Sequence, residues 1–153
     1  MFELYTENAK RVIFFARVEA SKLGTPEIQA THLLLGLLQQ PRAMFARLNF
    51  PGARLTEMRK ACADAAPRGE PIPTSVDMQL DASSVNILDR AKEERQKHKS
   101  KDIDVEHLLL ATLYVPSRAR DILYQHGLTY EQISADIFKR RVDPPPESAL
   151  DYT

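Results

Sequence analysis

Two histidines hold similar places in this chain, and histidine is the residue type here with the widest chemical use. His32 follows Thr31 and precedes a run of leucines, and His107 follows Glu106 and precedes another. An imidazole can bind a metal ion or act as a general base near neutral pH. The spacing of the four histidines and the single cysteine matches no zinc pattern. Because each histidine opens a leucine-rich segment, we predict a structural role in which the imidazole bonds a backbone group near a helix start.

The residues just before these histidines also fit the start of a helix. Thr31 has a hydroxyl suited to cap a helix, because it can accept a hydrogen bond from an unpaired backbone N–H. Glu106 places a carboxylate where it would interact favourably with the positive end of a helix dipole.

An aromatic pair near the N-terminus is a second kind of candidate site. Phe14 and Phe15 are adjacent, and successive residues of a helix point about 100° apart, so both cannot face the core. We predict that Phe14 contributes to an exposed apolar patch suited to a partner protein. The alternative is that Phe14 packs against the loop at 67–75.

No pattern in the sequence indicates catalysis, a cofactor or nucleotide binding. A Walker A motif needs two glycines and a lysine in one short run, and the five glycines of this chain lie far apart. Cys62 falls on the apolar face of a predicted helix and is expected to be inert. Glu19 and Glu94 are expected on exposed helix faces, paired with lysines three residues further on. The basic residues between 90 and 101 alternate with acidic ones, so no nucleic-acid site is predicted.

The elements that would position these residues occur twice. Residues 6–66 align with residues 81–141 without a gap, which indicates an internal duplication. The aligned identities include Ala16 with Ala91, Glu19 with Glu94, Ile28 with Ile103, His32 with His107, Leu38 with Leu113, Pro41 with Pro116 and Gly52 with Gly127.

Each copy is predicted to contain four helices. In the first copy, a helix capped by Thr6 ends at Gly24, an apolar helix covers 31–38, a third element begins at Pro41, and a fourth helix runs over 54–66. In the second copy, Asp81 or Ser83 caps a helix whose apolar residues include Val85, Ile87 and Leu88, and further helices cover 105–113, 118–125 and 129–140. No stretch alternates with period two, so no strand is predicted. The fold class is therefore all-α, with two pseudo-twofold four-helix repeats packed as a single domain.

The predicted domain covers 1–141, with repeat one at 1–66, a linker rich in proline at 67–79, and repeat two at 80–141; a Pro-rich tail follows at 142–153. Of the 153 residues, 43% are hydrophobic, and the formal net charge is zero. This composition is that of a soluble protein with no general attraction to nucleic acid or anionic membranes. The N-terminus lacks a signal-peptide pattern, so we expect a cytoplasmic protein, monomeric in isolation.

Several segments resemble the N-terminal domain of the Clp/Hsp100 unfoldases. They are the run from Tyr5 to Val12, the run from Ala16 to Ala20, the run from Thr31 to Leu38, and the second-repeat run from Val105 to Leu110. The resemblance extends over about residues 1–141 and implies a domain that docks substrate proteins or adaptors for an ATP-driven unfoldase. Some members carry glutamate before the histidine in both repeats, where the pair helps to bind phosphorylated arginine on substrates. Here Glu106 matches and Thr31 does not.

The sequence thus favours a non-catalytic module that binds proteins through the groove between the repeats, with Glu106, Thr31 and Phe14 as candidate contacts. Its expected partners are substrate proteins or adaptors, Clp unfoldase or peptidase subunits, and phosphoarginine-marked proteins. The alternative is a free-standing accessory subunit that regulates a Clp complex, which should co-purify with unfoldase or peptidase subunits. An enzyme using His32 or His107 ranks last.

Overall fold

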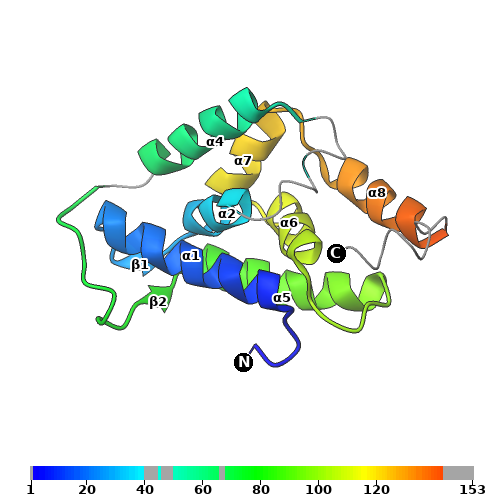
Figure 1. Cartoon of the computed structure of the whole chain (residues 1–153), viewed down its shortest axis with the longest axis horizontal. Coiled ribbons are helices and arrows are strands. Elements are labelled where there is room, and N and C mark those ends of the chain that lie inside the picture. The colour runs from blue at the N-terminus through cyan, green and yellow to red at the C-terminus, as the bar shows by residue number, and fades with distance from the viewer. Residues whose placement is uncertain (1, 40–44, 46–49, 66–67, 143–153) are drawn as a thin grey trace.

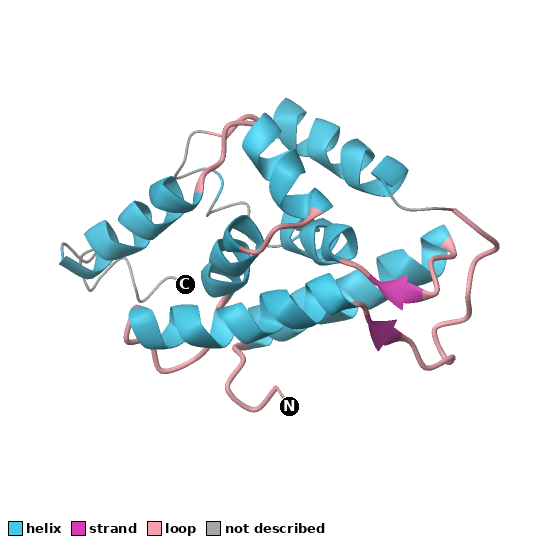
Figure 2. Ribbon diagram, turned by 180° about the vertical axis from the view of Figure 1, so that it is seen from behind, coloured by secondary structure: helices cyan, strands magenta, loops and turns pink. Residues whose placement is uncertain are grey.

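The computed structural model describes residues 2–39, 45, 50–65 and 68–142, which form a layered arrangement of helices with two very short strands (Figures 1 and 2). Helices α1 (Glu7–Leu23) and α5 (Ala82–Lys97) lie along one side of the molecule. Helices α2 (Ala30–Gln39) and α6 (Val105–Tyr114) occupy the middle. Helices α4 (Gly52–Ala65), α7 (Arg118–Gln125) and α8 (Tyr130–Val142) lie on the opposite side. The predicted all-α fold class is confirmed.

The two central helices explain why the leucine runs are so apolar. Every residue of α2 from Ala30 to Leu38 is buried, and so is α6 from His107 to Leu113. A helix that is apolar all round must be covered on all sides. Here α2 packs against α1, α4, α6 and α7, and α6 packs against α5, α7 and α8.

The helix ends follow the predicted capping residues. The Thr6 hydroxyl accepts a hydrogen bond from the Ala9 N–H at 3.1 Å, and the Asp81 carboxylate accepts one from the Ser84 N–H at 2.9 Å. These two caps are equivalent in the alignment of the repeats, and each contributes about 1 kcal/mol to helix stability. At the other end of α1, Gly24 adopts a left-handed conformation with φ of 71°, which costs glycine little.

The prediction that the chain has no strands is wrong, although the strands are short. β1 (Glu27–Ile28) pairs in parallel with β2 (Gln79–Leu80), and Tyr5 forms an isolated parallel bridge with Ile103. These are equivalent pairs, since Tyr5 aligns with Leu80 and Ile28 with Ile103. A strand of two residues is too short to show the alternation that identifies strands in a sequence.

These strand pairs interlock the two repeats. The Thr6 N–H donates to the Ile103 carbonyl at 3.0 Å, and the Asp81 N–H donates to the Ile28 carbonyl at 3.0 Å. In both cases the residue that opens the first helix of one repeat is bound to a segment of the other repeat. The pseudo-twofold arrangement predicted from the duplication is therefore visible at the level of single hydrogen bonds.

The segment that connects the repeats is a loop, as predicted, and is attached to the C-terminal half of α1. The Gly69 N–H donates to the Leu23 carbonyl, and the Ile72 N–H donates to the Ser21 carbonyl, both at 2.9 Å. The Arg17 guanidinium binds the carbonyl oxygens of Thr74 and Val76. Arg17 therefore holds the loop in place.

Three details depart from the predicted helix faces or fall outside the described residues. Val85 is 42% exposed rather than buried, because it lies on the side of α5 away from α6. The third element predicted at Pro41 lies outside the described residues apart from Phe45, which is buried. Residues 143–153 of the predicted tail also lie outside them, and the domain boundaries stay predictions.

Candidate functional site

The two repeat-related histidines both bond the backbone at a helix start. The Gln29 N–H donates to Nδ1 of His32 and the Asp104 N–H donates to Nδ1 of His107, each at 2.9 Å. Both side chains are buried. Burial lowers the pKa of His32 to about 4, while the negative charge of Asp81 opposes this shift. His32 is therefore neutral at physiological pH, with Nδ1 as acceptor and its proton on Nε2.

The starts of α2 and α6 are equivalent in position but opposite in charge. At α6, the Asp104 carboxylate accepts from the Val105 N–H at 2.8 Å, and Glu106 stands in the first turn. At α2 the equivalent positions carry Gln29 and Thr31, and the first turn has no acidic residue. The sequence therefore places two carboxylates at one helix start and none at the other.

The prediction that Thr31 caps α2 is wrong. The helix already begins at Ala30, so Thr31 stands inside its first turn. Its side chain is 3% exposed, and Oγ1 has no hydrogen-bond partner among the residues that the structure describes. His32, through its bond to the Gln29 N–H, takes the place of the expected cap.

A pocket between the repeats collects the starts of three helices. Its cavity is about 250 Å³ in volume. The first repeat contributes Gln29, Ala30 and Thr31 at the start of α2, and the second contributes Asp81 and Ser83 from the start of α5 and Ser117 and Arg118 from the start of α7. We call this set of residues the inter-repeat pocket. Because each helix start has the positive end of a helix dipole, three such ends converge here.

Two polar side chains of this pocket are already engaged in capping. Oδ1 of Asp81 accepts hydrogen bonds from the Ser83 hydroxyl and the Ser84 N–H, both at 2.9 Å. The Ser117 hydroxyl accepts from the Arg120 N–H at 3.1 Å. Arg118 and Thr31 are thus the side chains most available to an incoming group.

The three residues predicted to contact partners do not share one pocket. Thr31 lines the inter-repeat pocket, whereas Glu106 is half-buried at the start of α6 and Phe14 is 62% exposed on α1. The Phe14 ring meets the edge of Phe15 at a centroid distance of 5.8 Å. Sequence reasoning did not single out Arg118 or Ser117. A serine before a helix signals a cap, but nothing in the sequence shows that this cap lies beside Thr31.

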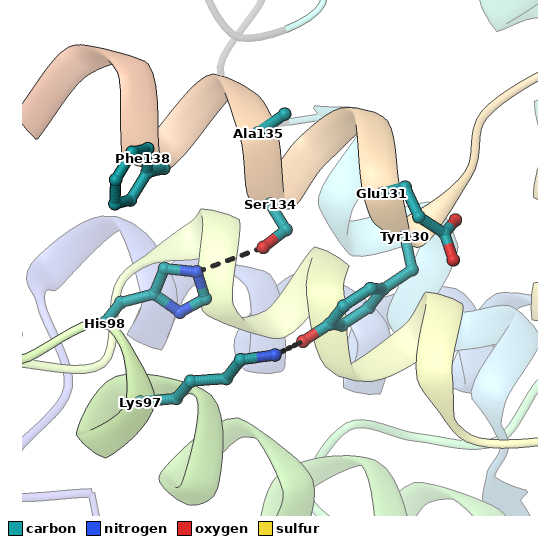
Figure 3. Close-up of a pocket in the computed structure, with 7 residues that line it drawn as sticks. All are labelled: Lys97, His98, Tyr130, Glu131, Ser134, Ala135 and Phe138. Atoms are coloured by element: carbon teal, nitrogen blue, oxygen red, sulfur yellow. Dashed lines mark hydrogen bonds between the residues drawn. The ribbon is translucent and has the colours of Figure 1, made fainter.

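A second pocket lies between the end of α5 and α8 (Figure 3). It has a volume of about 480 Å³, and Lys97 and His98 face Tyr130 and Ser134 across it. The Lys97 ammonium donates to the Tyr130 hydroxyl at 2.7 Å. This hydrogen bond raises the pKa of Lys97.

Beneath that pocket, Glu94 is fully buried, so the prediction that it is solvated is wrong. Its carboxylate accepts hydrogen bonds from the Tyr130 hydroxyl and from Nη2 of Arg90, the latter at 3.1 Å. A buried carboxylate requires such donors. Glu19, its repeat equivalent, is partly exposed and does pair with Lys22, at 3.9 Å.

The described residues contain no group of three or more His, Cys, Asp or Glu side chains placed to hold a metal ion. Over the same part of the chain, every helix is too short or too polar to traverse a lipid bilayer.

Comparison with known proteins identifies the family. A model of the Clp repeat (R) N-terminal domain matches residues 4–126. The chloroplastic chaperone protein ClpD2 of Oryza sativa subsp. japonica is 28% identical over 145 residues, and the chloroplastic chaperone protein ClpC of Pisum sativum is 31% identical over 114 residues. These matches cover 92% and 74% of this chain but only 15% and 12% of those proteins.

The fold agrees with the same assignment. The N-terminal domain of the chaperone ClpD from Arabidopsis thaliana superposes with a TM-score of 0.71 at 24% sequence identity, over 92% of this chain and 96% of that one. The resemblance seen in the sequence is therefore confirmed, and the chain belongs to the family of the Clp repeat N-terminal domain, the N-terminal domain of Clp unfoldases.

Proposed function

We propose that this chain is a non-catalytic docking module that holds substrate proteins or adaptors for an ATP-dependent Clp unfoldase or protease. The observation that carries the proposal is the inter-repeat pocket, which is polar, open to solvent and built from both repeats. Its walls are the starts of well-packed helices, so the site is preorganised and loses little conformational entropy when a partner binds.

Two further features support a surface that binds polypeptides. The Phe14 side chain offers an exposed apolar contact on α1, and aromatic side chains are favoured anchors at protein interfaces. Glu106 offers a carboxylate at the start of α6, which can pair with a guanidinium group. We propose that these two residues contribute separate contacts to one extended partner, and that Glu106 is the residue through which a phosphoarginine-marked protein would be recognised.

The direct test is binding of fluorescently labelled, unfolded casein to the full chain, measured by anisotropy. We expect saturable binding that weakens about threefold to tenfold in Glu106→Ala and in Phe14→Ala, since each loses one interface contact. Glu131→Ala is the matched control, because Glu131 is an exposed carboxylate on α8 that lies away from both contacts. An absence of binding to casein and to phosphoarginine peptides at any concentration would overturn the proposal.

A further inference from the structure

We propose that the inter-repeat pocket binds an anionic group, a carboxylate or a phosphate, carried by the docked polypeptide. This inference rests on the docking function proposed above and specifies the chemistry of one of its contacts. It follows from the convergence of an uncompensated helix start, a buried hydroxyl without a partner, and an arginine with no counter-charge.

The start of α2 is the uncompensated one. In the second repeat, the equivalent helix start is neutralised by Asp104 and Glu106. In the first repeat, Gln29 and Thr31 leave the α2 dipole without a carboxylate. The N–H groups at such a helix start bind anions readily.

The Thr31 hydroxyl is the second observation that points to a ligand. It is more than nine-tenths buried, lines the pocket, and has no hydrogen-bond partner in the described part of the chain. Leaving a buried hydroxyl unsatisfied is unfavourable. An oxygen of a bound carboxylate or phosphate could accept a hydrogen bond from it at this position.

Arg118 supplies the charge. It is exposed and forms the first residue of α7, where its positive charge adds to the positive end of the helix dipole rather than opposing it. Among the described residues no carboxylate forms an ion pair with it. A bound anion would relieve this repulsion and could accept two parallel hydrogen bonds from the guanidinium.

The same pocket is poorly suited to a cationic group. Asp81 is the one carboxylate among its lining residues, and Oδ1 of Asp81 already caps α5. A guanidinium group would therefore face Arg118 and three helix starts without a dedicated acceptor. The two repeats thus offer opposite chemistry at equivalent positions, with anion binding beside Thr31 and cation binding beside Glu106.

The test uses the full chain and NMR titration of backbone amides with inorganic phosphate and with acetate. We expect saturable shifts centred on the amides of Ala30 and Thr31. Arg118→Gln should weaken phosphate binding about tenfold, as expected for loss of a charged hydrogen-bond donor. Thr31→Glu should abolish it by supplying the missing carboxylate. Arg120→Gln is the matched control, because Arg120 lies on the same helix but over the Tyr124 ring.

Two peptides of one sequence, one with glutamate and one with phosphoserine at its centre, distinguish the source of the anion. Preference for either peptide, lost in Arg118→Gln, supports the inference and identifies the group. Because Arg118 is on the surface, this variant is expected to fold even if Thr31→Glu does not. Shifts that fail to saturate, that map elsewhere, or that persist in Arg118→Gln would overturn it.

Labelled casein separates this inference from the docking function. If casein binds but neither phosphate nor Arg118→Gln affects it, docking stands and the anion pocket is wrong. If phosphate binds at Ala30 but casein and the peptides do not bind, the pocket holds an anion, and the docking function on which this inference rests is overturned.

Discussion

A histidine at the first turn of α2 and of α6 replaces a conventional cap, and this has a cost that depends on pH. The imidazole of His32 can accept the Gln29 N–H only while it is neutral. Its burial beneath the helix start excludes the water that would solvate a charged ring. The residue is therefore a structural acceptor whose protonation opposes folding.

Acidification should destabilise the protein through His32. The pKa of His32 is about 4 in the folded protein and 6.5 in the unfolded chain, so the unfolded state binds the extra proton between these values. The free energy of unfolding should therefore fall as the pH decreases below 6.5, by about 2 kcal/mol at pH 5 from this residue alone. Urea denaturation at pH 7.5, 6 and 5 measures the effect.

The comparison variant is His32→Asn, whose amide oxygen can accept the same N–H but does not titrate. It should be less stable than the wild type at pH 7.5 and should lose less stability on acidification. His126→Asn, at the end of α7, is the control and should retain the wild-type dependence on His32. Equal acid sensitivity in wild type and His32→Asn would contradict the assignment.

Gly36 permits the closest approach between α1 and α2. A Cβ atom at Gly36 would lie 2.3 Å from the Val12 carbonyl oxygen, and backbone cannot move aside as a flexible side chain could. Gly36→Ala should therefore destabilise the protein by about 2 kcal/mol, although alanine is the better helix former. Ala111→Gly, at the equivalent position in α6, should cost only about 1 kcal/mol. Thermal denaturation of the two variants tests this order, and a stabilised Gly36→Ala would refute it.

At the scale of elements, helix α8 is tied to α5 by a buried polar contact. Tyr130 on α8 donates to the fully buried Glu94 carboxylate of α5 and accepts from Lys97 at 2.7 Å. Arg90 completes the set by bonding Glu94 and stacking over the Tyr114 ring at 3.6 Å. Since Ile133 and Ile137 are the buried apolar residues of α8, this polar contact contributes a large share of its attachment.

Removing the phenolic hydroxyl should loosen α8 selectively. In Tyr130→Phe, Glu94 loses a buried donor, which should lower the free energy of unfolding by about 1–3 kcal/mol. Hydrogen exchange of the α8 amides should accelerate, while exchange in α2 stays near the wild-type rate. Tyr124→Phe removes a hydroxyl that bonds the Leu113 carbonyl at a half-exposed site, and its effect should be smaller. Similar exchange changes in the two variants would count against the contact.

The sequence could predict the elements whose signals are local. The buried face of α1, the caps at Thr6 and Asp81, and the span of α7 all depend on residues within a few positions of one another. The burial of Glu94 could not be predicted, because its donor Tyr130 is 36 residues away. For the same reason the pocket that joins Thr31 to Arg118 was not foreseen, although each residue was readable as part of a helix start.

For the molecule as a whole, the duplication produces a domain in which neither copy is self-contained. The first helix of each repeat begins at a backbone bond to the other repeat, through Ile103 in one case and Ile28 in the other. The central helices α2 and α6 also pack against each other, and α4 of the first repeat packs against α7 of the second. Both repeats therefore supply the core that each one needs.

We therefore expect neither repeat to fold alone. Residues 1–66 expressed as a fragment would expose the face of α2 that α6 and α7 cover, and residues 80–142 would expose the matching face of α6. Burial of apolar area is the main source of stability, and fragments of this size already bury too little of it. Each fragment should show weak helical circular dichroism without cooperative unfolding, whereas the full chain should unfold in a single transition with the same midpoint for circular dichroism and for hydrogen exchange. An equimolar mixture of the fragments should regain helicity at high concentration, because the interlocking contacts are not covalent. A cooperatively folded single fragment, or two separate transitions in the full chain, would show that the repeats are independent and that the pocket between them is not preorganised.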